Sequence, residues 1–222
     1  MSEIDFMEYS SDANAQAAYV TNASVGESVD QQQTTYDNDD AFGKGSTNQM
    51  HYGQSFQLSG TLVVTAVEVR RGGSTSGTPS GNWTFRIETD NSGVPSGTLA
   101  DANASIVVTP PAENTVIKGT FATPFSLNAS TLYWLVITCP DQATNVYWTL
   151  SSKLNAYGYY GAYWYTVGGW TGGWGWNRYF KVYVQSYSLQ SYSEATIKTQ
   201  GSYSLKAVAT TGALNKTLTK TF

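Results

Sequence analysis

The segment NWTFRIET (residues 82–89) alternates apolar and polar side chains. Its apolar residues Trp83, Phe85 and Ile87 fall on one face of an extended chain, and the residues between them are polar. This period of two is typical of an antiparallel strand with one buried face and one solvent-facing face. The segment TLYWLVIT (residues 131–138) is almost continuously apolar, so we expect it to lie centrally in a sheet with both faces covered.

Further segments rich in β-branched and aromatic residues are separated by turn-forming Gly, Pro and Asn. They span residues 60–70, 104–109, 115–121, 145–151, 178–187 and 202–210. Only the Ala-rich stretch within residues 10–21 favours a short helix, which Ser11 or Asp12 can cap. Many short strands without intervening helices predict an all-β fold, namely an antiparallel two-sheet β-sandwich of jelly-roll or immunoglobulin-like type with one short N-terminal helix.

The charge pattern excludes several classes of partner. The net charge is −4, and the 12 Lys and Arg residues are scattered singly apart from Arg70 and Arg71, so no basic stripe is available to neutralise phosphates. We therefore expect no nucleic acid partner. No apolar run approaches the length of about 20 residues that a transmembrane helix requires, so we expect no membrane insertion.

Residues with catalytic chemistry are few. His51 is the only histidine and Cys139 the only cysteine, which excludes an internal disulfide and leaves no metal site based on these two residue types. We expect Cys139 to be a small buried residue and His51 an ordinary polar residue at a strand edge. Glu68 and Glu88 could form a glycosidase carboxylate pair. Yet both fall on the polar, wet faces of their strands, beside Arg70 and Arg86, and a cross-strand ion pair explains them better. We therefore expect no enzyme activity.

The segment YDNDD (residues 36–40) resembles the start of a calcium loop. Asp37, Asp39 and Asp40 are spaced to offer oxygen ligands, but the glycine and the distal bidentate glutamate of such a loop are absent. A solvated loop is the preferred interpretation, and a structural calcium ion is the second. We expect no other cofactor.

The segment AYGYYGAYWYTVGGWTGGWGWNRYF (residues 156–180) combines many aromatic rings with glycine. We expect residues 157–165 to contribute to the core or to a sheet surface. In residues 168–177 glycine is too frequent for one regular strand, so we expect at least some of the three tryptophans there to lie on a loop at a rim of the sandwich. Exposed tryptophan clusters usually mark interaction sites. The candidate ligand-binding residues are Tyr165, Trp170, Trp174, Trp176 and Asn177.

The middle of the chain, about residues 50–185, resembles the choice-of-anchor R type of β-sandwich domain. The resemblance rests on an ordered set of phrases rather than one motif: YGQSFQLSGTLVVTAVEVRR, GNWTFRIETDNSGVPSGTLA, FATPFSLNASTLYWLVIT and NRYFKVYV. Such domains occur in bacterial surface and phage-associated proteins. Because the family has no established catalytic residues, the resemblance implies an architecture more than an activity.

The two ends resemble consecutive pieces of a second module, the opening of lectin-like jelly rolls of environmental bacterial and viral surface proteins. These pieces are residues 5–22 and 189–222. The resemblance implies that residues 1–25 and 186–222 are two halves of a small flanking element, and that residues 26–185 are a sandwich inserted between them. Such an insertion is feasible because the ends of a domain commonly lie close together.

Two functions from different classes are consistent with these features. The first is a non-catalytic binding module of a surface or appendage protein, which binds a polysaccharide or glycan by stacking sugar rings on tryptophan and tyrosine. The second is a structural protein of a virion, phage tail or extracellular filament, in which the same aromatics form an interface between copies of the chain. The expected location is extracellular or on a virion surface, although the acidic, polar N-terminus contains no signal peptide.

Overall fold

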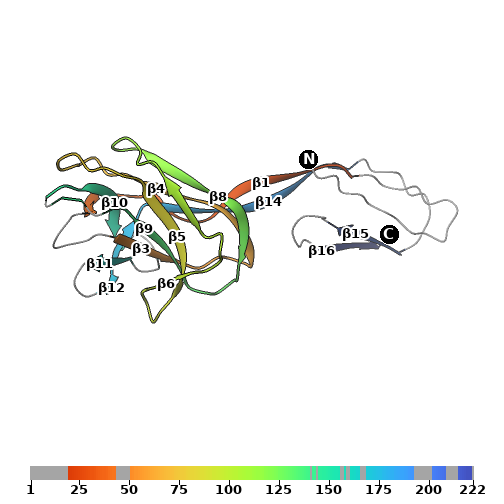
Figure 1. Ribbon diagram of the computed structural model, residues 1–222. Helices are drawn as coiled ribbons and strands as arrows, with labels where there is room; N and C mark the ends of the chain where they lie inside the picture. Colours follow the sequence, from red (N-terminus) through yellow and green to blue (C-terminus); the bar gives the residue numbers. More distant parts are fainter. Residues whose placement is uncertain are drawn as a thin grey trace. The chain divides into compact units, whose positions relative to one another are not determined.

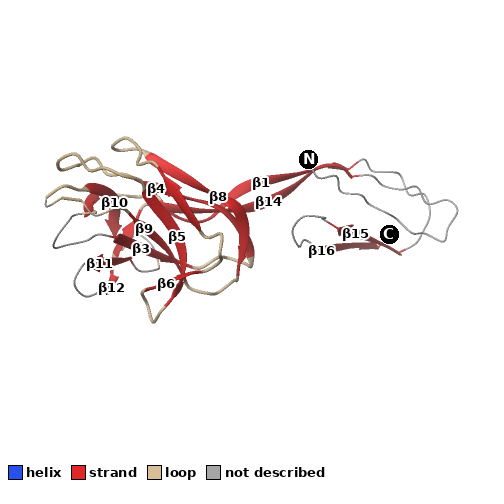
Figure 2. Cartoon of the chain, viewed as in Figure 1, coloured by secondary structure: helices blue, strands red, loops and turns tan. Residues whose placement is uncertain are grey.

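The computed structural model describes residues 20–43, 51–140, 142–143, 145–155, 158, 161–165, 169–192, 202–208 and 215–221. These residues form strands, turns and loops, and none of them is helical (Figure 2). The predicted all-β sandwich is therefore confirmed. Residues 10–19 of the expected N-terminal helix lie outside the described residues, and residues 20 and 21, at its expected end, belong to a strand.

The strands follow one another along the chain as shown in Figure 1. Their bounds are β1 (Val20–Gln33), β2 (Asn38–Phe42), β3 (His51–Phe56), β4 (Leu62–Arg70), β5 (Trp83–Asp90), β6 (Pro95–Leu99), β7 (Ser105–Val108), β8 (Val116–Leu127), β9 (Tyr133–Thr138), β10 (Trp148–Leu154), β11 (Gly161–Tyr165), β12 (Gly169–Trp174), β13 (Trp176–Arg178), β14 (Phe180–Tyr192), β15 (Ser202–Val208) and β16 (Asn215–Thr221).

Three sheets surround the main core. One has the strand order β1-β14-β4-β8, and a larger one has the order β12-β11-β3-β9-β5-β6, with β7 also paired to β5. A three-stranded sheet with the order β13-β10-β2 completes the arrangement (Figure 1). The registers of these sheets are antiparallel, as the period of two predicted. Strand β9 lies between β3 and β5, and its first five residues are buried, which confirms its predicted central position.

The core lies between the inner faces of these sheets. The inner-facing residues of β5, Trp83, Phe85 and Ile87, are fully buried, as the alternation predicted. The opposing sheet contributes the inner-facing residues of β14, Phe180 and Val182 among them. Cys139 is buried in the same core, which confirms the sequence-based expectation of a small buried residue.

The chain divides into two compact units, Glu27–Gln185 and Met1–Gly26 with Ser186–Phe222. The first unit contains the core described above. In the second, β15 and β16 pair as an antiparallel ladder from Ser202↔Thr221 to Val208↔Asn215. The proposal that the two terminal segments are halves of one interrupted module stays a prediction.

Candidate functional site

The glycine- and tryptophan-rich segment forms strands rather than a loop. Trp170 and Trp174 lie in β12, and Trp176 begins β13, with a bend at Gly175 between them. The expectation of a rim loop is therefore wrong for all three tryptophans. The reason is a register shift between β11 and β12 that leaves Gly173 without a partner, so the irregularity that glycine favours is absorbed as a bulge inside a strand pair.

A second, smaller apolar cluster lies on the outer face of the seven-stranded sheet. Trp134 and Val136 alternate with core-facing residues of β9 and so point away from the main core, yet both are fully covered. Trp170 from β12 packs against them and is itself half-buried. One indole is thus held on the outer face of the sheet with part of its surface exposed.

Small residues create the room for this cluster. Gly53 on the neighbouring strand β3 pairs with Val136, and a Cβ atom at Gly53 would lie 3.1 Å from Cε3 of Trp134 and 2.9 Å from Cγ of Pro95. The Trp134 ring therefore lies directly over the backbone of β3. Its Nε1 donates a hydrogen bond of 2.7 Å to Oδ1 of Asp90, which fixes the orientation of the indole.

Polar groups border the cluster on the β5–β6 side. Glu88, opposite Trp134 in the register, is buried and accepts a hydrogen bond of 2.8 Å from the Gly97 amide. Arg86 forms an ion pair with Glu88 at 3.1 Å and donates to the Gly97 carbonyl oxygen at 3.0 Å. An apolar patch with fixed polar neighbours can take up the apolar face of a ligand while bonding its polar edge.

The other predicted ligand-binding residues do not all join this patch. Trp176 is half-buried at the start of β13, in the three-stranded sheet. The expectation that Asn177 contacts a ligand has to be corrected, because this residue is fully buried. Its carbonyl oxygen accepts a hydrogen bond of 3.4 Å from Nε2 of Gln33. Tyr165 and Trp174 end β11 and β12, and their side chains are outside the described part of the structure.

The three candidate calcium ligands are separated and engaged elsewhere. Asp39 and Asp40 are consecutive in β2, so they point to opposite faces of the sheet. Asp39 accepts hydrogen bonds from the Gly73 amide at 2.6 Å and from Ser151 Oγ at 3.1 Å. Asp37 forms an ion pair with a lysine. No group of three or more metal-binding side chains gathers within the described ranges, so the calcium interpretation has no support there.

Glu68 and Glu88 are buried, which corrects the expectation that they lie on wet faces. The partner of Glu68 is Lys181, opposite it on β14 at 2.8 Å, rather than Arg70. The hydroxyl of Tyr183 also donates to Glu68 at 2.9 Å. The pKa of the Tyr183 phenol is raised, first by burial and second by this hydrogen bond. The hydrogen bond to Glu68 raises the pKa of Lys181 as well. The cross-strand ion pair is confirmed for Glu68, whereas Glu88 pairs along its own strand.

His51 is the first residue of β3, which lies inside the seven-stranded sheet between β11 and β9. It is half-buried and pairs with Trp164 in the register. The expected position at a strand edge is thus wrong, since β3 has neighbours on both sides.

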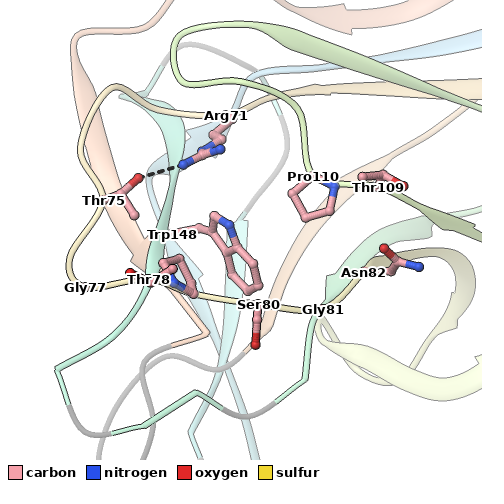
Figure 3. A pocket seen from close by; sticks show the side chains of 11 residues that line it. Arg71, Thr75, Gly77, Thr78, Ser80, Gly81, Asn82, Thr109, Pro110 and Trp148 are labelled. Carbon is pink, nitrogen blue, oxygen red and sulfur yellow. Dashed lines mark hydrogen bonds between the residues drawn. The ribbon is translucent and has the colours of Figure 1, made fainter.

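The structure also contains a pocket of about 510 Å³ that the sequence did not indicate (Figure 3). It lies beside the turn-rich segment that follows β4, where Gly, Ser, Thr and Pro predicted only a reversal of the chain. Side chains around the opening include Arg71, Thr75, Asn82 and Trp148. A pocket built from loops has no periodic pattern, so no signal in the sequence could have located it.

Comparison of the chain with models of protein families, with curated protein sequences and with solved structures found no match. The resemblance to choice-of-anchor R domains and to lectin-like jelly rolls therefore stays a prediction. Within the described residues, no helix has the length and apolar character of a membrane span.

Proposed function

We propose that the protein is a non-catalytic binding module that binds carbohydrate on the outer face of the seven-stranded sheet. The observation that carries this proposal is the partly exposed indole of Trp170, which packs on the fully buried Trp134 and Val136. Sugar rings have apolar faces that stack on aromatic side chains. An indole already held by its neighbours loses little side-chain freedom on binding, which lowers the cost of association.

The polar neighbours support the same ligand class. Hydroxyl groups at the edge of a stacked sugar need donors and acceptors in fixed positions. Asp90, held by its bond to the Trp134 indole, and the partly exposed guanidinium of Arg86 offer such groups on the same face of the sheet. Only 13% of the residues are charged, which is consistent with a neutral ligand recognised by hydrogen bonds and stacking.

A glycan array probed with the full chain tests this proposal and identifies the sugar. Trp170→Ala should raise Kd for the bound glycan by about 2- to 12-fold, because aromatic stacking contributes about 0.5–1.5 kcal/mol. Trp170→Tyr should retain part of the affinity, since it keeps a ring. Tyr36→Ala is a matched control. Tyr36 is an exposed ring in the loop between β1 and β2, beside Arg70 of the four-stranded sheet and away from the Trp170 patch.

The competing assembly function predicts a different pattern. An interface between copies should bury about 800 Å² on each partner and give an oligomer that dissociates on dilution. A size-exclusion profile that shows such an oligomer, its loss in Trp170→Ala, and no bound glycan on the array would overturn the carbohydrate proposal in favour of assembly.

A further inference from the structure

The 510 Å³ pocket beside the loop of residues 71–82 has the size of a small-molecule site, since such pockets usually measure about 300–1,000 Å³. The indole of Trp148 lies at its base, and hydroxyl and amide side chains from the loop and from the segment after β7 line the rest (Figure 3). These polar residues are Thr75, Thr78, Ser80, Asn82 and Thr109.

The base of the pocket is rigid. Trp148 is only 3% exposed, and its ring meets that of Trp83 edge to face at 5.9 Å between centroids. Because Trp83 is fully buried in the main core, the position of the pocket floor is set by the packing of the sandwich itself. A ligand in the pocket would contact an apolar surface that needs no rearrangement.

The loop of residues 71–82 forms the wall of the pocket. The first half of this loop is held by backbone hydrogen bonds to β10 and to the residue just before β10. The Gly72 amide donates to the Thr149 carbonyl oxygen at 2.9 Å. Ser76 and Tyr147 exchange two backbone hydrogen bonds, of 3.1 and 3.0 Å. The polar loop is thus positioned by backbone pairing rather than by burial of apolar side chains.

The second half of the loop is fixed by a side chain. Gln142 accepts a hydrogen bond from the Ser80 amide at 2.9 Å and donates one to the Ser80 carbonyl oxygen at 3.0 Å. This reciprocal pair mimics a strand ladder. A wall held at both halves before binding avoids the ordering cost that a free loop would add.

Among the described residues that line the pocket, Arg71 alone is charged, and it is already engaged. Arg71 donates to the Pro111 carbonyl oxygen at 2.6 Å and to Thr75 Oγ1 at 2.8 Å, and it forms an ion pair with Glu113 at 3.4 Å. An anionic ligand would have to compete with these acceptors. The remaining polar groups of the lining are neutral hydroxyls, an amide and backbone, which suit a ligand with several hydroxyl groups.

We propose that this pocket is a second binding site, which takes one neutral monosaccharide unit at the exposed edge of Trp148 with its hydroxyls on the loop. The pocket goes beyond the Trp170 patch, because Trp148 belongs to the main core whereas Trp170 packs on the separate outer cluster. It rests on the proposed function only for the ligand class.

Saturation-transfer NMR of the full chain with free glucose, galactose, mannose, fucose, N-acetylglucosamine and glucuronic acid tests the proposal. The chain should be produced without N-glycosylation, because Asn82 begins an Asn-Trp-Thr sequon. At least one neutral sugar should show transfer. Thr78→Trp, which places a ring on the exposed wall, should abolish it, and Asn82→Ala should raise Kd by about 2- to 12-fold through loss of a hydrogen bond.

A matched control tests whether the effect of Thr78→Trp is local. Thr123→Trp adds the same ring to an exposed position of β8 and should leave transfer unchanged. Transfer kept in Thr78→Trp but lost in Trp170→Ala would overturn the pocket while leaving the Trp170 patch intact. Transfer from glucuronic acid alone, or from none of the sugars, would also overturn the pocket, whatever the glycan array shows.

Discussion

The ion pair between Asp40 of β2 and Arg178 of β13 offers a sharp test of how the three-stranded sheet is held in place. Nη1 of Arg178 donates to Oδ2 of Asp40, and the guanidinium carbon lies 3.7 Å from the ring centroid of Tyr52 in the core. Burial lowers the pKa of Arg178 to about 9, because removal from water disfavours its charged form. We expect Asp40→Ala to be strongly destabilising.

The magnitude follows from burial. Arg178 is 4% exposed, so the variant would leave a buried charge without its carboxylate, which costs about 3–5 kcal/mol. The Asp40 side chain is 23% exposed, so water can enter in its place, and the lower end of that range applies. Replacement of both partners, in Asp40→Ala with Arg178→Met, should cost less than Asp40→Ala alone, because no buried charge then remains.

Urea unfolding of the full chain, followed by tryptophan fluorescence, measures both effects. Asp37→Ala is a matched control three residues away, because its ion pair with Lys153 is 57% and 38% exposed and should contribute no more than about 1 kcal/mol. The reasoning is refuted if Asp40→Ala costs no more than Asp37→Ala, or if the losses of the two single variants simply add in the double variant.

Two further predictions concern the four-stranded sheet and the outer cluster. Burial alone would raise the pKa of Glu27, but hydrogen bonds, one of them from Lys118, lower it below 4.5. The stability that this lowered pKa provides is therefore present above pH 4.5 and is lost as the pH falls through the folded-state pKa. Between pH 6 and pH 3, Glu27→Gln should lose less unfolding free energy than the parent protein, as measured by urea titrations. Gly53→Ala should lower the free energy of unfolding by about 1–3 kcal/mol, because the new Cβ would crowd Trp134. Gly60→Ala, whose Cβ would have no neighbour closer than 3.8 Å, should change stability by less than about 0.5 kcal/mol. Equal thermal melting of the two variants would contradict this reasoning.

Strands with a clear period were predictable from the sequence. The alternation in β5 and the continuous apolar run in β9 indicated which residues are buried and that β9 is central, because both signals arise from one strand alone. Trp83 was expected on the core-facing side of its strand and Trp134 within a central strand, and both are buried. The separate cluster around Trp134 was not foreseen, since it depends on a ring from β12 and a glycine from β3.

Features that depend on partners far apart in the chain could not be predicted from the sequence. Strand β2 contains three polar residues in five and was expected to be a loop, yet it pairs with β10 across more than 100 residues. The burial of Glu68 is similar, because a carboxylate is expected to be exposed unless a partner such as Lys181 is supplied from another strand. Local patterns record the faces of a strand but not the residues that another strand brings to it.

The outer faces of the two large sheets differ in what they leave unsatisfied. On the four-stranded sheet, Lys181 and Tyr183 point away from the core, and both bond to the carboxylate of Glu68, so the charge on this face is already neutralised within the protein. On the seven-stranded sheet, the outer face instead carries an apolar cluster, and the Trp170 ring of this cluster stays partly exposed to water. Removal of that apolar surface from water is favourable, whereas a saturated ion pair gains nothing from a new partner. Of these two outer faces, that of the seven-stranded sheet should therefore bind a neutral ligand, and a rise in salt concentration should affect this binding little.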